Sequence, residues 1–437
     1  MLSALLSRFR AKPPPPVPTP RAAPAAARAT LSQPAAAAPD GHSATGVGAR
    51  RPLVSAQGRL AGFEFQVGAA MLGRLQGPAA QACTANLLGA MRLCCSQGLG
   101  ALAELPAGWL VHVPDQDLAR GMHLLLRADA LCEDADAACA LISRLRRAGV
   151  RVGWNPLAMP QAAGRPDFMP VPPPAGAGGA ADAPAWQQAV RRCGARWPDV
   201  PLLLLELPTV EALEALLAPQ VLWAACSLGA CSEAPRAQAL PPQAQRALRL
   251  LNQLLHDEDH AAVVADIKAD AALSLRLLQY LNSAGALPGQ ELDSIEQAVL
   301  LLGRDALYRW VAQMLVRMSP PRPAAHALQT TALARARLCE LLARANGAPN
   351  PGALYLLGLA TMLPTLLHCD IDEAAGALRL PAHAVQALRQ QGGPWMPYLG
   401  LLQALEAADM PRIEAAAGVF GGHERVLACW AEAWRGV

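Results

Sequence analysis

The stretch from Asp270 to Gly303 constrains the fold most, because it contains a helix with a recognisable beginning and end, followed by a second one. The carboxylate of Asp270 can cap the first helix. Apolar residues then recur at helical spacing, at Leu273, Leu277, Tyr280 and Leu281. The polar and small residues that follow, which are Asn282, Ser283 and Gly285, predict the end of this helix.

The second helix of this stretch follows a loop that contains Pro288 and Gly289. Asp293 and Glu296 have the three-residue spacing of a capping box. Behind them comes an apolar stripe, which consists of Ile295, Val299 and Leu302 and ends at Gly303. Two apolar helices in sequence predict a packed, all-helical module.

The letters DAALSLRLLQYLNSA from Asp270, followed by SIEQAVLLLG from Ser294, closely resemble the HDOD family of helical signalling domains. That family is similar to the HD metal-dependent phosphohydrolases but lacks their metal ligands. The resemblance therefore implies protein-mediated signalling rather than hydrolysis.

Length, charge and cysteine content limit the remaining possibilities. A chain of 437 residues has room for two domains and a tail. The net charge of +3 gives no support to nucleic-acid binding, which needs a basic patch. The 11 cysteines show no metal-ligand spacing, so we expect reduced thiols in a cytoplasmic protein. No apolar run reaches the ~18 to 20 residues of a transmembrane segment.

Residues 1–50 are dominated by proline and alanine, and residues 13–20 read PPPPVPTP. This composition favours an extended, disordered leader that cannot form a core. The start, MLSALLSRFR, lacks the features of a signal peptide, and a short amphipathic membrane anchor is the alternative.

Residues 51–233 alternate between strand-like and helical patterns. The clearest helix runs from Asp134 to Ala148. The expected strands are Pro52 to Ser55, Gly62 to Val67, Trp109 to Val113, His123 to Leu126, Val150 to Trp154, Leu202 to Glu206 and Val221 to Cys226. This alternation predicts a parallel sheet closed into a (β/α) barrel or a variant of one, with any ligands at the carboxyl ends of the strands.

The opening RPLVSAQGRLAGFEFQV and the stretch DALCEDADAACALISRLRRAGVRVGW resemble the EAL-type cyclic di-GMP phosphodiesterases. That family holds divalent cations with carboxylates. Glu64 matches the signature glutamate, but Phe65 and Gln66 replace the residues that follow it. The resemblance retains one further carboxylate, Glu206. We expect both to be solvated, or paired with an arginine such as Arg59 or Arg74.

The other metal-binding positions implied by this resemblance are lost. His112 stands in place of an asparagine, and Ala128 in place of a glutamate. The paired aspartates become Asn155 and Pro156, and a lysine and an aspartate become Pro170 and Pro172. Two carboxylates do not hold two metal ions, so phosphodiesterase activity is not expected.

Residues 236–437 read as helices throughout, beginning near Pro241 and Pro242. His256, Asp257 and His260 contain the His-Asp letters of the HD hydrolases, but they lie between two predicted helices, with Asp259 placed to cap the second. We expect a solvated connector there.

The helix that resembles the HD-bearing one reads LLGLATMLPTLL from Leu356. The metal-binding pair would fall at Thr361 and Met362, which are not metal ligands of that kind, and Pro364 interrupts the helix. His368, Cys369 and Asp370 are expected to cap and turn the chain. Three tail tryptophans are expected to be packing residues, namely Trp395, Trp430 and Trp434.

The sequence therefore predicts a multidomain protein, a degenerate (β/α) TIM-like barrel followed by an all-α HDOD helical bundle. The expected boundaries are a leader at 1–50, an EAL-like domain at 51–233 and an HDOD domain at 236–437. We predict a non-catalytic signalling scaffold with no catalytic, cofactor-binding or metal-binding residue and no cofactor. Its partner would be a signalling protein of unknown identity, with non-hydrolytic cyclic di-GMP binding as the alternative.

Overall fold

The computed structural model describes residues 49–67, 75, 77–174, 183–226, 228, 240–256, 259–283, 294–407 and 409–435. All of them belong to one compact unit, Ser43–Val437. The expectations for the leader at 1–50 and for Arg74, Asp257, Pro288, Gly289 and Asp293 fall almost entirely on residues outside these ranges.

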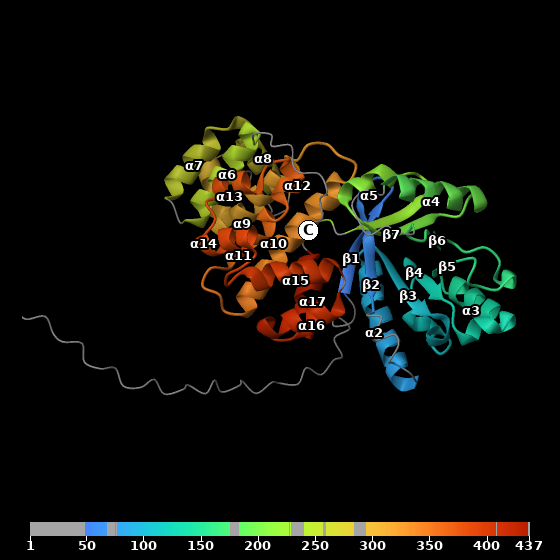
Figure 1. The fold of residues 1–437 in the computed structure, drawn as a ribbon. Helices are drawn as coiled ribbons and strands as arrows, with labels where there is room; N and C mark the ends of the chain where they lie inside the picture. Colours follow the sequence, from blue (N-terminus) through green and yellow to red (C-terminus); the bar gives the residue numbers. More distant parts are fainter. Residues whose placement is uncertain are drawn as a thin grey trace, which may run out of the picture. The chain divides into compact units, whose positions relative to one another are not determined.

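The first part of the chain is an eight-stranded sheet with helices against it (Figure 1). The strands are β1 Ala49–Ser55, β2 Leu60–Gln66, β3 Gly100–Pro106, β4 Met122–Arg127, β5 Arg151–Trp154, β6 Met169–Pro170, β7 Leu202–Leu207 and β8 Val221–Cys226. The α-helices are α2 Gly77–Ser96, α3 Ala135–Arg147, α4 Ala183–Arg196 and α5 Val210–Leu216. Short 3-10 helices lie at Ala107–Leu110, Asp115–Asp117, Ala130–Glu133 and Gln161–Ala163.

The strand order is β5-β4-β3-β2-β1-β8-β7-β6. β1 runs antiparallel to β2 and β8, whereas the remaining neighbours are parallel. Asp167 links the two sheet ends, since its backbone N–H donates to Val152 O at 2.9 Å and its carboxylate accepts from Val152 N at 2.8 Å. The sheet is therefore nearly closed and resembles a barrel.

Aromatic rings fill the inside of this sheet. Trp223 and Phe168 belong to a buried cluster with leucines from several strands. A Cβ at Gly100 would lie 2.5 Å from the Trp223 ring, and one at Gly153 would lie 2.4 Å from the Phe168 ring. These glycines are needed because the rings occupy the space that a side chain would take.

The prediction of a strand from Trp109 to Val113 is wrong. Pro106 ends β3, and the residues after it form a 3-10 helix, Ala107–Leu110. Leu110 and Val113 are buried, but they belong to this turn and the residues after it and not to a strand. β3 itself was missed because its sequence, GALAELP, is poor in β-branched and aromatic residues.

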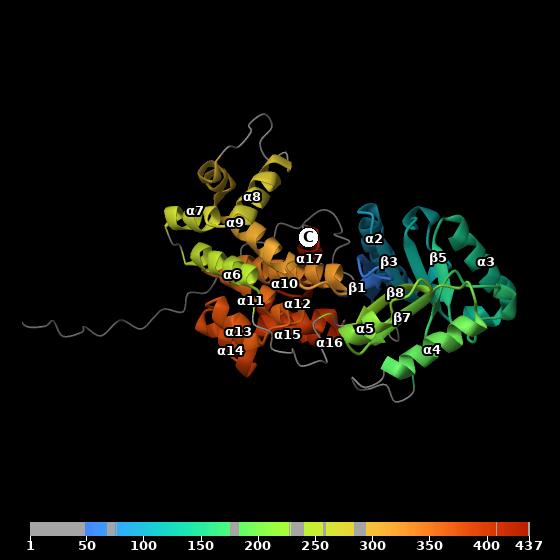
Figure 2. The ribbon, with the colours of Figure 1, turned by 90° about the horizontal axis from the view of Figure 1, so that it is seen from above.

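The rest of the described chain is helical (Figure 2). Its helices are α6 Pro242–Leu255, α7 His260–Lys268, α8 Ala271–Ser283, α9 Ile295–Arg317, α10 Ala325–Ala345, α11 Pro351–Ala360, α12 Leu363–Leu367, α13 Ile371–Ala377, α14 Ala382–Gln390, α15 Met396–Glu406, α16 Met410–Ala417 and α17 His423–Ala433, with a 3-10 turn at Gly418–Phe420. Trp430 and Trp434 are buried, and Trp395 is partly buried against the core, as expected for packing residues.

The described residues of the stretch from Asp270 to Gly303 belong to α8 and α9 and their caps. The Asp270 carboxylate accepts hydrogen bonds from the backbone of Ala272 and Leu273 at 3.1 Å, which confirms the cap. Tyr280, which was expected on the buried face, is 38% exposed. The N-cap of α9 is Ser294 and not Asp293, because the Ser294 hydroxyl accepts from Gln297 N.

Candidate functional site

Glu64 lies on β2 and is buried beside Arg51 of β1. The antiparallel register sets these two residues directly opposite one another. Arg51 Nε donates to Glu64 Oε2 at 2.8 Å, and Gln66 Nε2 donates to Oε1 at 3.1 Å. Both side chains of the ion pair are 8% exposed. Of the two expected alternatives, solvation is wrong for Glu64 and pairing with an arginine is confirmed, although the partner is Arg51 and not Arg59. Arg74 lies outside the described residues.

Glu206 differs from Glu64 in its surroundings. It lies near the end of β7 with a φ of 61°, and its side chain is exposed to solvent. The solvated interpretation is therefore confirmed for Glu206, and its carboxylate does not join Glu64 in a buried pocket.

The remaining positions of the EAL-like pattern follow four different elements of the sheet half. His112 is exposed in the turn after Ala107–Leu110, and not at the end of a strand. Ala128 follows β4, whereas Asn155 and Pro156 follow β5. The Asn155 side chain accepts a hydrogen bond from Leu157 N, which orders the turn. Pro170 ends β6, and Pro172 is exposed beyond it.

The segment with the His-Asp letters connects α6 to α7. His256 and His260 are exposed. His256 follows the last residue of α6, and its Nδ1 lies 2.9 Å from the carbonyl oxygen of Asn252 in the last turn of that helix. Asp259 caps α7 by accepting from Ala261 N. For the described residues of this segment, the expectation of a solvated connector is confirmed.

Thr361 and Met362 lie at the break between α11 and α12, and Pro364 lies in the first turn of α12, which begins at Leu363. The Met362 side chain is fully buried. The Thr361 hydroxyl donates to Gly358 O at 2.6 Å and accepts from Arg335 Nη1 at 2.9 Å. This position therefore belongs to a hydrogen-bonded arginine site.

Arg335 of α10 forms a bidentate ion pair with Glu406 of α15, with both Nε–Oε1 and Nη2–Oε2 distances at 2.5 Å. The side chains are 7% and 3% exposed. A pair buried this deeply loses hydration on both sides, so each group depends on the other for its stability.

The Arg335–Glu406 pair lies in the wall of a cavity of about 420 Å³. The polar lining comes from this pair, Thr361 and two exposed glutamines. Apolar side chains of α13, α14 and α15 supply the rest, including Ile371, Leu388, Met396, Leu399 and Leu402. The cavity therefore combines a buried ion pair and other polar groups with an apolar wall.

His368, Cys369 and Asp370 connect α12 to α13. His368 adopts a left-handed conformation with φ 52°, and Asp370 caps α13 by accepting from Asp372 N. Cys369 is buried, and burial raises the pKa of its thiol to about 11. The three residues turn and cap the chain, as expected from the sequence.

Two findings concern metals and membranes. Within the described ranges, no three His, Cys, Asp or Glu side chains gather closely enough to hold a metal ion. Of the helices that the structure describes, none combines the length and the apolar character needed to cross a bilayer.

Three residues of the buried ion pairs were not predicted from the sequence, namely Arg51, Arg335 and Glu406. Arg51 lay one residue outside the predicted first strand, so its register with Glu64 was not considered. Arg335 and Glu406 are 71 residues apart in sequence. A charged residue at an otherwise apolar helix position was the one available signal.

Comparison with known proteins identifies two curated relatives. The chain is 32% identical to the uncharacterized protein YuxH of Bacillus subtilis over 161 residues, which are 36% of this chain and 39% of YuxH. It is 28% identical to the cyclic di-GMP phosphodiesterase CdgJ of Vibrio cholerae over 176 residues, which are 40% of each protein. The chain thus spans about two fifths of the length of these relatives.

Two solved structures are also similar to parts of the chain. One is the EAL domain of Mycobacterium smegmatis DcpA, with 14% identity, a TM-score of 0.31, and coverage of 42% of this chain and 88% of that one. The other is an HDOD domain protein of unknown function from Geobacter sulfurreducens, with 17% identity, a TM-score of 0.30, and coverage of 44% and 88%. The HDOD domain model matches residues 240–382, so the segment containing α6 to α13 is an HDOD domain.

Proposed function

We propose that this protein is a non-catalytic signalling regulator that acts as a protein-interaction scaffold in a cyclic di-GMP pathway. In this proposal the sheet of residues 51–233 is a degenerate EAL-like barrel, and residues 236–437 act with the HDOD domain as a recognition surface. The partner is a second signalling protein.

The observation that supports the proposal is that, in each half, an arginine side chain contacts a residue at a position where the resembling family has a metal ligand. Arg51 neutralises Glu64, the buried carboxylate that matches the EAL signature. In the helical half, Arg335 contacts Thr361, which stands where the HD family has a metal ligand. A guanidinium that already pairs with a carboxylate opposes the binding of a divalent cation to the same oxygens.

The pathway assignment draws support from the relative CdgJ, which is named a cyclic di-GMP phosphodiesterase. The alternative function is a non-hydrolytic cyclic di-GMP receptor. Loss of metal ligands does not abolish nucleotide binding, because arginine side chains and backbone amides hold phosphates without a metal.

Calorimetric titration of the full chain with cyclic di-GMP, with and without Mg²⁺ or Mn²⁺, tests these functions when followed by chromatography for the linear product. The scaffold proposal expects neither binding heat nor product. Saturable heat without product would replace it with the receptor function. Product formed by the wild type would overturn both.

Glu64→Gln is the control for contaminating phosphodiesterase. Any product made by this chain through the EAL-like site would disappear in the variant, whereas a contaminant would act equally on both samples. If neither heat nor product is found, immobilised full chain should retain a signalling protein from lysate.

A further inference from the structure

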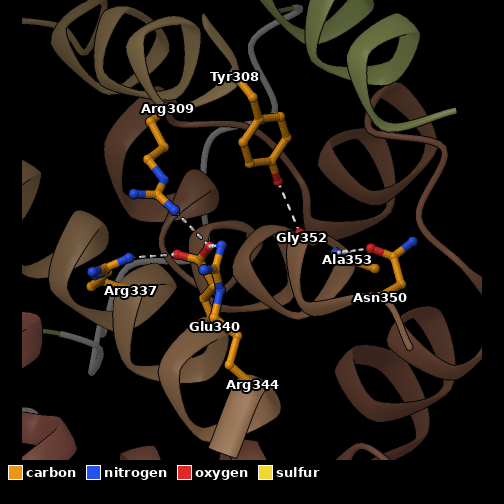
Figure 3. Close-up of polar contacts among 8 residues, drawn as sticks. All are labelled: Tyr308, Arg309, Arg337, Glu340, Arg344, Asn350, Gly352 and Ala353. Carbon is orange, nitrogen blue, oxygen red and sulfur yellow. Dashed lines mark hydrogen bonds and ion pairs between the residues drawn. The ribbon is translucent and has the colours of Figure 1, made fainter. Parts of the chain in front are cut away.

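Glu340 on α10 is surrounded by three arginine side chains (Figure 3). Its Oε1 accepts from Arg309 Nη2 at 2.9 Å and from Arg344 Nη2 at 2.7 Å, and its Oε2 accepts from Arg337 Nη1 at 3.1 Å. Arg309 comes from α9, whereas Arg337 and Arg344 lie on either side of Glu340 along α10. The three guanidinium groups therefore converge on one carboxylate.

The carboxylate is buried but the arginines are not. The Glu340 side chain is 5% exposed, whereas those of Arg309, Arg337 and Arg344 are 37%, 29% and 50% exposed. Each guanidinium has five N–H donors, and each of these hydrogen bonds to Glu340 uses one of them. The cluster thus presents additional donors on its solvent side, with Glu340 fixing the directions of the three side chains.

The charges in this cluster do not cancel. Three guanidinium groups and one carboxylate leave an excess of two positive charges, while a single arginine would be enough to neutralise Glu340. Asp305, one helical turn before Arg309, is exposed and forms no ion pair with the cluster in the described part of the chain. Neutralisation of a buried glutamate therefore explains only part of the arrangement.

We propose that Arg309, Arg337 and Arg344 form a binding site for a phosphoryl dianion. A phosphate monoester carries between about 1.5 and 2 negative charges at pH 7, which matches the excess of the cluster. Its three terminal oxygens accept hydrogen bonds from several guanidinium forks at once. A carboxylate carries half this charge, and a phosphodiester exposes fewer terminal oxygens.

This inference is independent of the proposed function, because the cluster shares no residue with the Arg51–Glu64 pair or with the cavity at Arg335. The phosphoryl group could belong to free phosphate or to a phosphorylated side chain of a partner protein. The chemistry of recognition is the same in both cases, so the experiment separates the two sources.

Phosphorus-31 NMR line broadening detects binding of a small phosphate to the full chain. O-phosphoserine and dimethyl phosphate, titrated at constant ionic strength in NaCl, compare a dianion with a monoanion. The proposal expects saturable broadening of O-phosphoserine and much weaker broadening of dimethyl phosphate. Equal broadening of both probes, or no saturable broadening, would overturn it.

Arg344→Gln and Arg309→Gln should each weaken O-phosphoserine binding by about tenfold or more, because each removes charge-assisted hydrogen bonds. Arg412→Gln is the matched control, since it removes the same charge from an exposed position on α16. Arg344→Lys keeps the charge but loses the fork, so it should fall between wild type and Arg344→Gln. Equal weakening by Arg412→Gln would show non-specific attraction and refute the site.

Circular dichroism of each variant checks that the fold is intact, and the half-exposed Arg344 is the variant least expected to disturb it. A phosphoserine pentapeptide that binds more tightly than inorganic phosphate would identify a protein partner as the source. Inorganic phosphate that binds as tightly as the peptide would identify free phosphate. Retention of the unphosphorylated peptide with equal affinity would contradict phosphoryl recognition.

Discussion

A small number of buried polar residues determine the character of the sheet interior. His123 on β4 lies among aromatic rings, with its ring centroid 4.2 Å from that of Trp223 and 5.5 Å from that of Phe168. Its Nδ1 lies 3.0 Å from the carbonyl oxygen of Gly121. Burial lowers the pKa of His123 from 6.5 to about 4, and the hydrogen bond to Gly121 offsets only part of this effect. His123 is therefore neutral in the folded protein near pH 7.

This lowered pKa makes the stability of the protein depend on pH. Between pH 6.5 and 4 the unfolded chain binds a proton at His123 that the folded chain does not, so stability decreases as the pH falls through this interval. The contribution is fully present above pH 6.5 and amounts to ~3 kcal/mol. Urea unfolding at pH 7.5, 5.5 and 4.5 should show a smaller loss of stability in His123→Leu than in wild type.

His112→Gln is the control for this measurement, because His112 is exposed. It should retain the wild-type dependence on pH. If the stability of His123→Leu depends on pH as steeply as that of wild type, groups other than His123 cause the pH dependence.

At the scale of elements, α9 shows how far the sequence could predict the fold. Gly303 was expected to end the helix, and it does break the helical conformation, with φ 72° and ψ 165°. The chain then resumes as a helix to Arg317, which the sequence argument did not anticipate. A glycine signal identifies a local break in backbone conformation, but tertiary packing decides whether the helix starts again.

The conformation of Gly303 is almost restricted to glycine, so Gly303→Ala should destabilise the protein by about 1 to 3 kcal/mol. A Cβ at this position meets no atom within 4 Å, so the cost comes from the backbone alone. Gly376→Ala in α13 is the matched control, because a Cβ there is also unobstructed and its φ is not positive. It should stabilise the protein by roughly 0.5 to 1 kcal/mol. If urea unfolding shows that both substitutions change the free energy of unfolding in the same direction, this explanation is contradicted.

The other predictions differ in the same way between features set by neighbouring residues and features set by tertiary packing. Caps and turns depend on neighbouring residues, so Asp259, Asp270 and Asp370 could be assigned from the sequence. The Arg335–Glu406 pair depends on packing between α10 and α15, which local spacing does not encode. The local caps were therefore predictable from the sequence, whereas the buried ion pairs between distant elements were not.

At the scale of the whole molecule, the sheet and the helices share buried polar contacts. Glu214 on α5 accepts from Arg322 Nε at 2.7 Å, from Arg322 Nη2 at 2.8 Å and from Ala324 N at 2.9 Å. Arg322 also donates to Thr365 O at 3.1 Å. From the other end of the chain, Trp430 Nε1 donates to Arg50 O in β1 at 3.1 Å. These contacts connect the strand-bearing half with residues inside the HDOD match and with a residue that follows it.

Glu214→Gln tests whether these contacts make the two halves one cooperative unit. The Arg322 and Glu214 side chains are 9% and 13% exposed, so the variant removes a buried carboxylate charge that pairs with Arg322 and should cost ~3 kcal/mol. Because the halves unfold together in this view, hydrogen exchange should show equal losses of protection among the slowest amides of residues 49–226 and 240–435.

Glu104→Gln provides the comparison, since Glu104 and its partner Arg127 are 43% and 46% exposed. Removing a surface pair of this kind should change stability by less than about 1 kcal/mol. A loss of protection confined to α5 and its neighbours in Glu214→Gln would contradict coupling between the halves. Cooperative coupling matters for the proposed scaffold, because a partner bound to the helices could then change the stability of the sheet through the same buried contacts.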